Sequence, residues 1–101
     1  MTSPPPPAPN AVIVVFAMKD CPACHEYVPR LQAIAGQFAG RVPYQILDAN
    51  DSANQAVAER FEIMATPTTM VLRKPAGAIK AEGALADSDI LRLFNIAAAT
   101  L

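Results

Sequence analysis

The feature that most limits how this chain can fold is an uninterrupted apolar run, Ala-Val-Ile-Val-Val-Phe-Ala-Met, from Ala11 to Met18. The run is rich in β-branched residues and carries no charge, which is typical of a strand covered on both faces. Such a strand lies inside a sheet with helices packed on each side. The sequence therefore predicts an α/β domain built around residues 11–18.

A long amphipathic helix is predicted directly after this strand. Pro22 suits the first position of a helix with Cys21 as its N-cap, and Gly40 can end it. Pro29 falls inside the helix and is expected to kink it. Spacings of four, three and four residues predict about five turns with one apolar stripe, formed by Tyr27, Leu31, Ile34 and Phe38.

Three further strands are predicted at residues 42–47, 68–72 and 78–82, the last two joined by a turn at Pro75-Ala76-Gly77. The β-α-β start implies two parallel strands, and the later hairpin adds antiparallel ones. The expected fold is a four-stranded mixed sheet flanked by three helices, in the order β-α-β-α-β-β-α.

Two shorter helices complete this expected order. The first follows the second strand, with caps available from Asn50, Asp51 and Ser52. Its predicted apolar face consists of Ala53, Val57 and Phe61. The second begins at a cap supplied by Asp87. Its predicted packing residues are Ile90, Leu91, Phe94 and Ala98.

The length of 101 residues is about that of one domain. Five of the ten prolines lie within the first nine positions, so residues 1–10 are expected to form a proline-rich flexible tail before a domain at 11–101. A net charge of −1 without a basic stripe argues against nucleic acid as a partner. No apolar run approaches the roughly 20 residues of a membrane span. A start without the basic and apolar segments of an export signal predicts a cytoplasmic location.

The chemistry of the chain is concentrated in Cys21-Pro22-Ala23-Cys24, where the predicted helix begins. The free N–H groups and positive end of a helix favour a thiolate over a thiol. A thiolate at Cys21 can attack a disulfide in a partner, and Cys24, one turn further on, can then displace that partner. Cys21 is therefore the expected nucleophile and Cys24 the expected resolving thiol, while Pro22 stiffens the ring.

Two alternatives remain open from these residues. A metal-binding or metal-carrier module could use Cys21 and Cys24, but zinc needs four ligands and the chain adds only one histidine, His25. Two chains could pool their cysteine pairs. The other alternative is a redox-silent protein-binding domain. A C-x-x-C pair in a βαβ context favours the redox function.

Several segments together carry a resemblance to a known family. The first strand and the Cys21–Cys24 loop match, and Pro29 matches a kinking proline in the following helix. Further matches are Ile46-Leu47-Asp48, Phe61-Glu62-Ile63-Met64-Ala65-Thr66-Pro67-Thr68 and Glu82-Gly83-Ala84-Leu85. In this order and at this spacing, they resemble the thioredoxin superfamily over nearly all of residues 11 to 100.

The resemblance implies how a substrate is held. It predicts a cis Thr66–Pro67 bond beside Cys21. The backbone of Thr66 would pair with an extended substrate segment, in the manner of strand addition. Gly83 and Ala84 would line the same groove.

The chain also departs from thioredoxins. It has Asp20 in place of the usual tryptophan before the first cysteine, and Val15 in place of a buried aspartate. It has no room before residue 11 for the usual opening strand and helix, so it resembles the smaller, glutaredoxin-sized form of the fold. The sequence does not identify a group that takes the proton of Cys24.

Three charged or polar neighbours are candidates for tuning the cysteine pair. The charge of Asp20 would oppose a thiolate if it faced Cys21, and Lys19 could offset that effect. A cationic His25 would favour the thiolate. The predicted function is reduction of disulfides in partner proteins by a monomer that needs no metal or organic cofactor. Its electron donor is either a reductase or glutathione.

Overall fold

The computed structural model describes residues 11–38, 40–73 and 77–99. The predicted tail at 1–10 and Pro75 and Ala76 of the predicted turn lie outside these residues. The helices and strands, in chain order, are β1 (Ala11–Ala17), α1 (Pro22–Ala35), β2 (Tyr44–Asp48), α2 (Gln55–Arg60), β3 (Thr68–Arg73), β4 (Ala78–Glu82) and α3 (Asp87–Ala99). This order confirms the predicted succession of strands and helices. None of the described helices is both long enough and apolar enough to cross a membrane.

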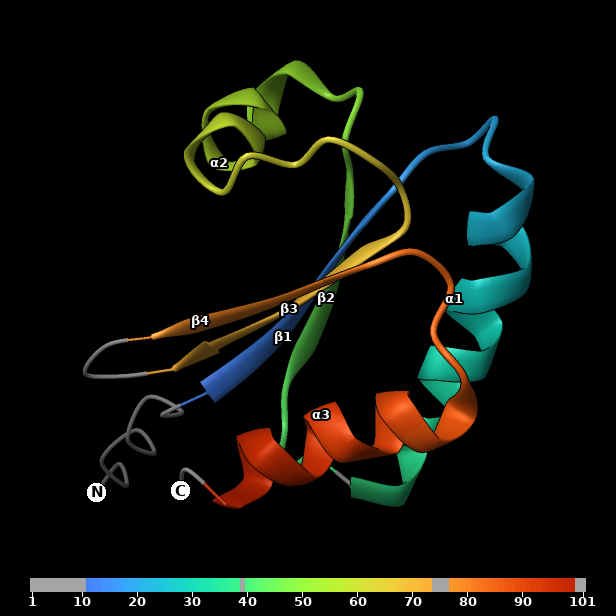
Figure 1. The fold of residues 1–101 in the computed structure, drawn as a ribbon, viewed down its shortest axis with the longest axis vertical. Coiled ribbons are helices and arrows are strands. Elements are labelled where there is room, and N and C mark those ends of the chain that lie inside the picture. The colour runs from blue at the N-terminus through green and yellow to red at the C-terminus, as the bar shows by residue number, and fades with distance from the viewer. Residues whose placement is uncertain (1–10, 39, 74–76, 100–101) are drawn as a thin grey trace, which may run out of the picture.

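The four strands form one mixed sheet in the order β2-β1-β3-β4 (Figure 1). β1 is parallel to β2 and antiparallel to β3, and β4 pairs antiparallel with β3. The parallel pair needs a crossover, which α1 provides. In this register, Ala17 lies opposite Asp48 of β2, and Val15 lies opposite Thr69 of β3. The C-terminal ends of β1 and β2 therefore lie side by side, and β1 leads directly to the cysteines.

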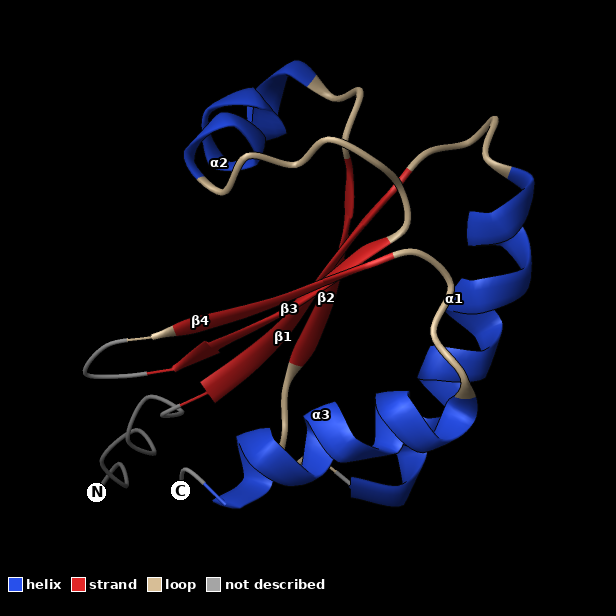
Figure 2. Cartoon of the chain, in the orientation of Figure 1, coloured by secondary structure: helices blue, strands red, loops and turns tan. Residues whose placement is uncertain are grey.

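Both faces of β1 are covered, as its apolar sequence predicted. Figure 2 shows α1 and α3 beside the sheet, with α2 lying apart from them. Ile13 and Val15 point into a cluster with residues of α1 and α3. Val14 and Phe16 point into a second cluster, against which Phe61 and other residues near α2 pack. The continuous apolar run therefore serves two cores, one on each side of the sheet.

α1 begins at Pro22 with Cys21 as its N-cap, as predicted. The α-helix ends at Ala35 and is followed by one turn of 3₁₀ helix, Gly36–Phe38. All four residues of the predicted apolar stripe are buried: Tyr27, Leu31, Ile34 and Phe38. Pro29 lies inside α1 and is exposed, and its effect on the direction of the helix stays a prediction.

The predicted apolar face of the second helix is only partly right. Ala53 is exposed and Val57 retains 38% of its surface, whereas Ala58 and Phe61 pack against the sheet. The reason is that residues 52–54 form a 3₁₀ turn before α2 begins at Gln55. A 3₁₀ turn has three residues per turn, whereas an α-helix has 3.6. The apolar face predicted by counting helical spacings from residue 53 is therefore rotated away from the observed one.

The predicted face of the last helix also needs one correction. Leu91 is 38% exposed, and Leu93 is buried in its place. Asp87 is the first helical residue of α3. The buried residues of this helix are Ile90, Leu93, Phe94 and Ala97. Their spacing of three, one and three follows the helical period, whereas Leu91 is turned about 100° away from Ile90.

Candidate active site

Cys21 and Cys24 are joined by a disulfide across the first turn of α1, with their Cα atoms 5.2 Å apart. The spacing follows from the local fold, because Cys21 is the N-cap and Cys24 stands three residues inside the helix. The backbone N–H of Cys24 donates to Cys21 Sγ over 3.1 Å. The sulfur therefore occupies the place where an N-cap side chain accepts a hydrogen bond.

The two sulfurs differ sharply in exposure. Cys21 is partly exposed, whereas Cys24 keeps only 2% of its surface. In the dithiol form, the N–H group and the helix N-terminus stabilise a negative charge on Cys21 Sγ. The accessible sulfur is thus the one that the helix favours as a thiolate. This asymmetry suits an attacking Cys21 and a resolving Cys24.

The loop before β3 places its backbone against Cys21. The Thr66–Pro67 peptide bond is cis, and the Thr66 carbonyl oxygen lies 3.6 Å from Cys21 Sγ. Pro67 is buried, and its carbonyl accepts a hydrogen bond of 2.8 Å from the N–H of Gly83. Residues more than forty positions apart therefore meet at the start of α1.

The segment after β4 leaves space beside this loop. Gly83 has a φ of +90°, a left-handed conformation that favours glycine. A Cβ atom built on Gly83 would meet no heavy atom within 4 Å, and Ala84, which follows, is exposed. Gly83 is thus in contact with Pro67 and open to solvent. The role of Thr66, Gly83 and Ala84 in holding a substrate stays a prediction.

A buried hydrogen bond fixes α1 to the strand that carries this loop. The Tyr27 hydroxyl lies 2.7 Å from Thr69 Oγ1, and both residues are almost fully buried. Burial raises the pKa of Tyr27, and this effect outweighs the Thr69 hydrogen bond and the charge of Arg30, which lower it. Nearby, Thr68 Oγ1 donates to the Ala65 carbonyl over 2.6 Å. The Tyr27–Thr69 bond joins α1 to β3, and the Thr68–Ala65 bond closes the loop that precedes β3.

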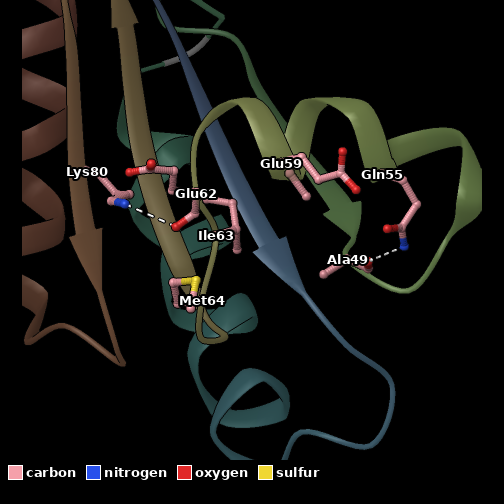
Figure 3. A pocket seen from close by; sticks show the side chains of 8 residues that line it. Ala49, Gln55, Glu59, Glu62, Ile63, Met64 and Lys80 are labelled. Atoms are coloured by element: carbon pink, nitrogen blue, oxygen red, sulfur yellow. Dashed lines mark hydrogen bonds between the residues drawn. The ribbon is translucent and has the colours of Figure 1, made fainter.

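Further contacts position the outer parts of the site. Arg30 of α1 forms ion pairs with Glu26 and with Asp87 of α3, and these hydrogen bonds raise the pKa of Arg30 above its usual value. Lys80 Nζ donates to the carbonyls of Phe61 and Glu62 over 3.2 Å each. Figure 3 shows the bond to Glu62. The Lys80 bonds join β4 to the segment between α2 and Thr66.

The three residues expected to tune the pair lie together in the structure. Lys19 and Asp20 are exposed in a turn in which the N–H of Cys21 donates to the Met18 carbonyl over 3.3 Å. His25 is also exposed, and its ring nitrogen Nε2 is hydrogen-bonded to the Lys19 carbonyl. The sequence showed no sign of this last contact. Tuning by Lys19, Asp20 and His25 stays a prediction.

Among the cavities on the described part of the chain, two are relevant here. One of about 650 Å³ lies away from the cysteines, between the α2 segment and β4 (Figure 3). The other, of about 460 Å³, borders the resolving cysteine and is called the Cys24 pocket below. It is lined by Ala17, Met18, Lys19, Cys24, His25, Val28, Pro29, Ile46, Leu47 and Asp48. Within residues 11–38, 40–73 and 77–99, no group of three or more His, Cys, Asp or Glu side chains is placed to hold a metal ion.

The fold and the cysteine pair at the start of α1 define a thiol–disulfide oxidoreductase domain. Comparison with protein families gives the same assignment, because the family model described as Thioredoxin matches residues 8–95. The chain belongs to the thioredoxin family.

Individual proteins are similar to this chain in sequence or in structure. A protein disulfide-isomerase of Datisca glomerata is 33% identical over 67 residues, which cover 63% of this chain and 13% of that protein. Chloroplastic thioredoxin z has a similar structure, with a TM-score of 0.74, 25% identity and coverage of 90% of this chain and 80% of that chain. Fasciola hepatica thioredoxin shares the fold at a TM-score of 0.72 and 18% identity, over 92% of this chain and 83% of that one.

Sequence reasoning missed three parts of the site. The Tyr27–Thr69 hydrogen bond has no signal in the sequence, because Tyr27 fits the apolar stripe of a helix and Thr69 fits the pattern of a strand. Lys80 is predicted only as a residue of the strand at 78–82, and its bonds to the Phe61 and Glu62 carbonyls, 19 and 18 residues away, have no local signal in the sequence. The sequence places Asp48 at the end of the second strand. Its position at the Cys24 pocket follows from the parallel register of β1 and β2, which only the folded structure reveals.

Proposed function

We propose that this protein reduces disulfide bonds in partner proteins through Cys21 and Cys24. The single observation that carries the proposal is the asymmetry of the pair: Cys21 is accessible at the N-terminus of α1, and Cys24 is 2% exposed behind it. Membership of the thioredoxin family supports it, because that family acts on protein disulfides. The chain spans only 13% of the disulfide-isomerase relative, so the activity of that larger protein is not transferred as a whole.

The reaction proceeds in two exchanges. The Cys21 thiolate attacks one sulfur of the partner disulfide, a mixed disulfide forms, and the other partner sulfur leaves as a thiolate. Cys24 loses its proton and attacks Cys21 Sγ, which forms the Cys21–Cys24 disulfide and releases the second partner sulfur. The two partner thiolates take up two protons. The partner gains two electrons and the protein loses two.

The groove that receives the partner is proposed to lie between the Thr66 backbone and the segment Gly83–Ala84. Support comes from the Thr66 carbonyl 3.6 Å from Cys21 Sγ and from the open space above Gly83. An extended segment of the partner would pair with the backbone at Thr66, so recognition would depend little on its sequence. The proposal also holds that the protein works as a monomer in the cytoplasm and that a reductase or glutathione reduces its disulfide again.

The test is a trapping experiment with two matched serine variants. Cys24→Ser should accumulate a mixed disulfide with a disulfide-bonded substrate protein, detected as an added mass that a reductant removes. Cys21→Ser should trap nothing, because the attacking sulfur is gone. If the reduced parent protein reduces no protein disulfide, or if Cys21→Ser traps as well as Cys24→Ser, the proposed function is wrong. Stoichiometric metal in freshly purified, reduced protein would favour the metal-carrier alternative.

A further inference from the structure

The hydrogen bond between His25 and Lys19 determines which ring nitrogen of His25 carries a proton. A backbone carbonyl can only accept a hydrogen bond, so Nε2 must be the donor. In the neutral ring, Nδ1 then has a free lone pair and can accept a proton. When Nδ1 is protonated, Nε2 still donates to the Lys19 carbonyl. The ring therefore keeps its orientation in both charge states, as a base that is used repeatedly requires.

His25 shares the Cys24 pocket with the resolving cysteine. Cys24 is closed to bulk solvent at 2% exposure, but it borders this pocket of about 460 Å³. On the sheet side of the helix, Val15 is fully buried and offers no acceptor. Of the residues that line the Cys24 pocket, His25 and Asp48 are the two whose side chains can accept a proton near neutral pH.

His25 is better placed than Asp48 for this task. Asp48 Oδ1 already accepts the N–H of Asn50 over 2.8 Å, and the Asp48 carbonyl accepts from Asn54, so this residue holds the turn after β2. His25 lines the same pocket as Cys24, and its Nδ1 is not used by the Lys19 bond. An imidazole also has an ordinary pKa nearer to neutrality than a carboxylate, which suits a general base.

We propose that His25 is the residue that accepts the proton of Cys24 when the mixed disulfide is resolved. This inference rests on the proposed function and adds its proton acceptor. The Cys24 S–H bond breaks, and the proton passes to His25 Nδ1 directly or through one water. The Cys24 sulfur attacks Cys21 Sγ, the Cys21–partner S–S bond breaks, and the imidazolium returns the proton to the departing partner thiolate or to water.

The charges around His25 come from every element that meets it. Lys19 and Asp20 lie in the preceding turn, Asp48 at the end of β2, and Glu26 next along α1. Glu26 is paired with Arg30, which reduces its effect on the imidazole. The other charged neighbours are Lys19, Asp20 and Asp48. Variants of the two that line the Cys24 pocket, Lys19 and Asp48, therefore belong in the same experiment.

The experiment follows one turnover of the reduced protein with one equivalent of an aromatic disulfide whose thiol product is coloured. Attack by Cys21 releases the first coloured thiol, and attack by Cys24 releases the second, so Cys24→Ser should lack the second phase. His25→Gln keeps an amide N–H for the Lys19 carbonyl but has no base near neutral pH. His25→Ala removes both functions.

We expect His25→Gln and His25→Ala to slow the second phase to the same extent near neutral pH, by about a hundredfold, the lower end of general-base effects. The first phase should stay within about twofold of the parent, since Cys21 does not use this base. At alkaline pH, Cys24 ionises without help and the rates should converge. Asp48→Asn and Lys19→Met each remove one neighbouring charge, and the second phase of both should remain much faster than that of His25→Gln near neutral pH.

Three results would overturn the proposal. In the first, His25→Gln retains the parent rate of the second phase while His25→Ala does not, which would reduce His25 to a support for the Lys19 turn. In the second, both phases slow equally at every pH. In the third, Asp48→Asn shows the expected pH-dependent defect instead. In each case the trapping experiment can still succeed, so failure of this proposal is distinguishable from failure of the proposed function.

Discussion

Replacing Tyr27 by Phe removes the hydroxyl that ties α1 to β3 behind the cysteines. The hydroxyl lies 2.7 Å from Thr69 Oγ1, and the two residues keep 0% and 1% of their surface. Because water does not reach the site, Thr69 Oγ1 would lose its partner without gaining another. A buried polar group left without a hydrogen bond costs about 1–3 kcal/mol of stability.

The reciprocal variant Thr69→Val should be destabilised to a similar degree, because it leaves the Tyr27 hydroxyl unpaired. The double variant Tyr27→Phe/Thr69→Val removes both polar groups and keeps the shape of the core. It should therefore be more stable than the sum of the two single losses predicts, with a coupling energy of about 1–2 kcal/mol. For a domain of this size, each kcal/mol corresponds to about 4–8 °C in Tm.

The assay is urea and thermal unfolding of the four proteins, all with the Cys21–Cys24 disulfide intact. Constant slopes of the urea transitions would show that the same cooperative unit unfolds in each protein. If the two single losses add without coupling, the hydroxyls do not bond to one another and the reasoning fails. Equal stability of Tyr27→Phe and the parent would refute it directly.

The same residue predicts a dependence on alkaline pH. The folded protein holds Tyr27 at a pKa above its usual 10.0, chiefly through burial. The neutral phenol therefore contributes stability that is complete below pH 10 and is lost as the pH rises through the folded-state pKa. We expect the free energy of unfolding of the parent to fall more steeply above about pH 10 than that of Tyr27→Phe. Parallel profiles of the two proteins would contradict this expectation.

Substitutions at three further residues have directions set by the structure, each measured as a change in Tm. Glu62 has a φ of +54°, so Glu62→Gly should stabilise the protein by about 0.5–1 kcal/mol, whereas Glu62→Ala should bring no gain. Gly83→Ala should destabilise it by about 1 kcal/mol and slow the reduction of protein disulfides more than that of a small aromatic disulfide. Leu31→Ala, in the core beneath α1, should cost about 2–5 kcal/mol.

Local patterns predicted the elements that carry the chemistry. The apolar run of β1, the Cys21 cap and Pro22 are each recognisable within a few residues, because strand burial and helix capping depend on adjacent side chains. The order of elements then limited the sheet to a mixed form with a parallel β1–β2 pair, which the structure confirms. This much needed no knowledge of tertiary contacts.

The contacts that complete the site could not be predicted in this way. The partners in the Tyr27–Thr69 bond are 42 residues apart, and those in the Lys80–Phe61 bond are 19 apart. Neither of these separations along the sequence corresponds to a helical or strand period. The apolar face of α2 was mispredicted for a related reason, since a 3₁₀ turn before it changed the rotation per residue. The spacing of apolar residues indicates the buried face of a segment only where the number of residues per turn stays constant.

Val15 and Thr69 together explain why a base for Cys24 should come from the outer side of α1. They lie opposite one another in the β1–β3 register, so their side chains share the face that meets the helix. The polar group at this place is a neutral hydroxyl pair between Thr69 and Tyr27, which is far less costly to bury than a carboxylate without a partner. A neutral pair with a raised tyrosine pKa does not take a proton from a thiol. Proton transfer from Cys24 is therefore directed toward the Cys24 pocket, where His25 lies.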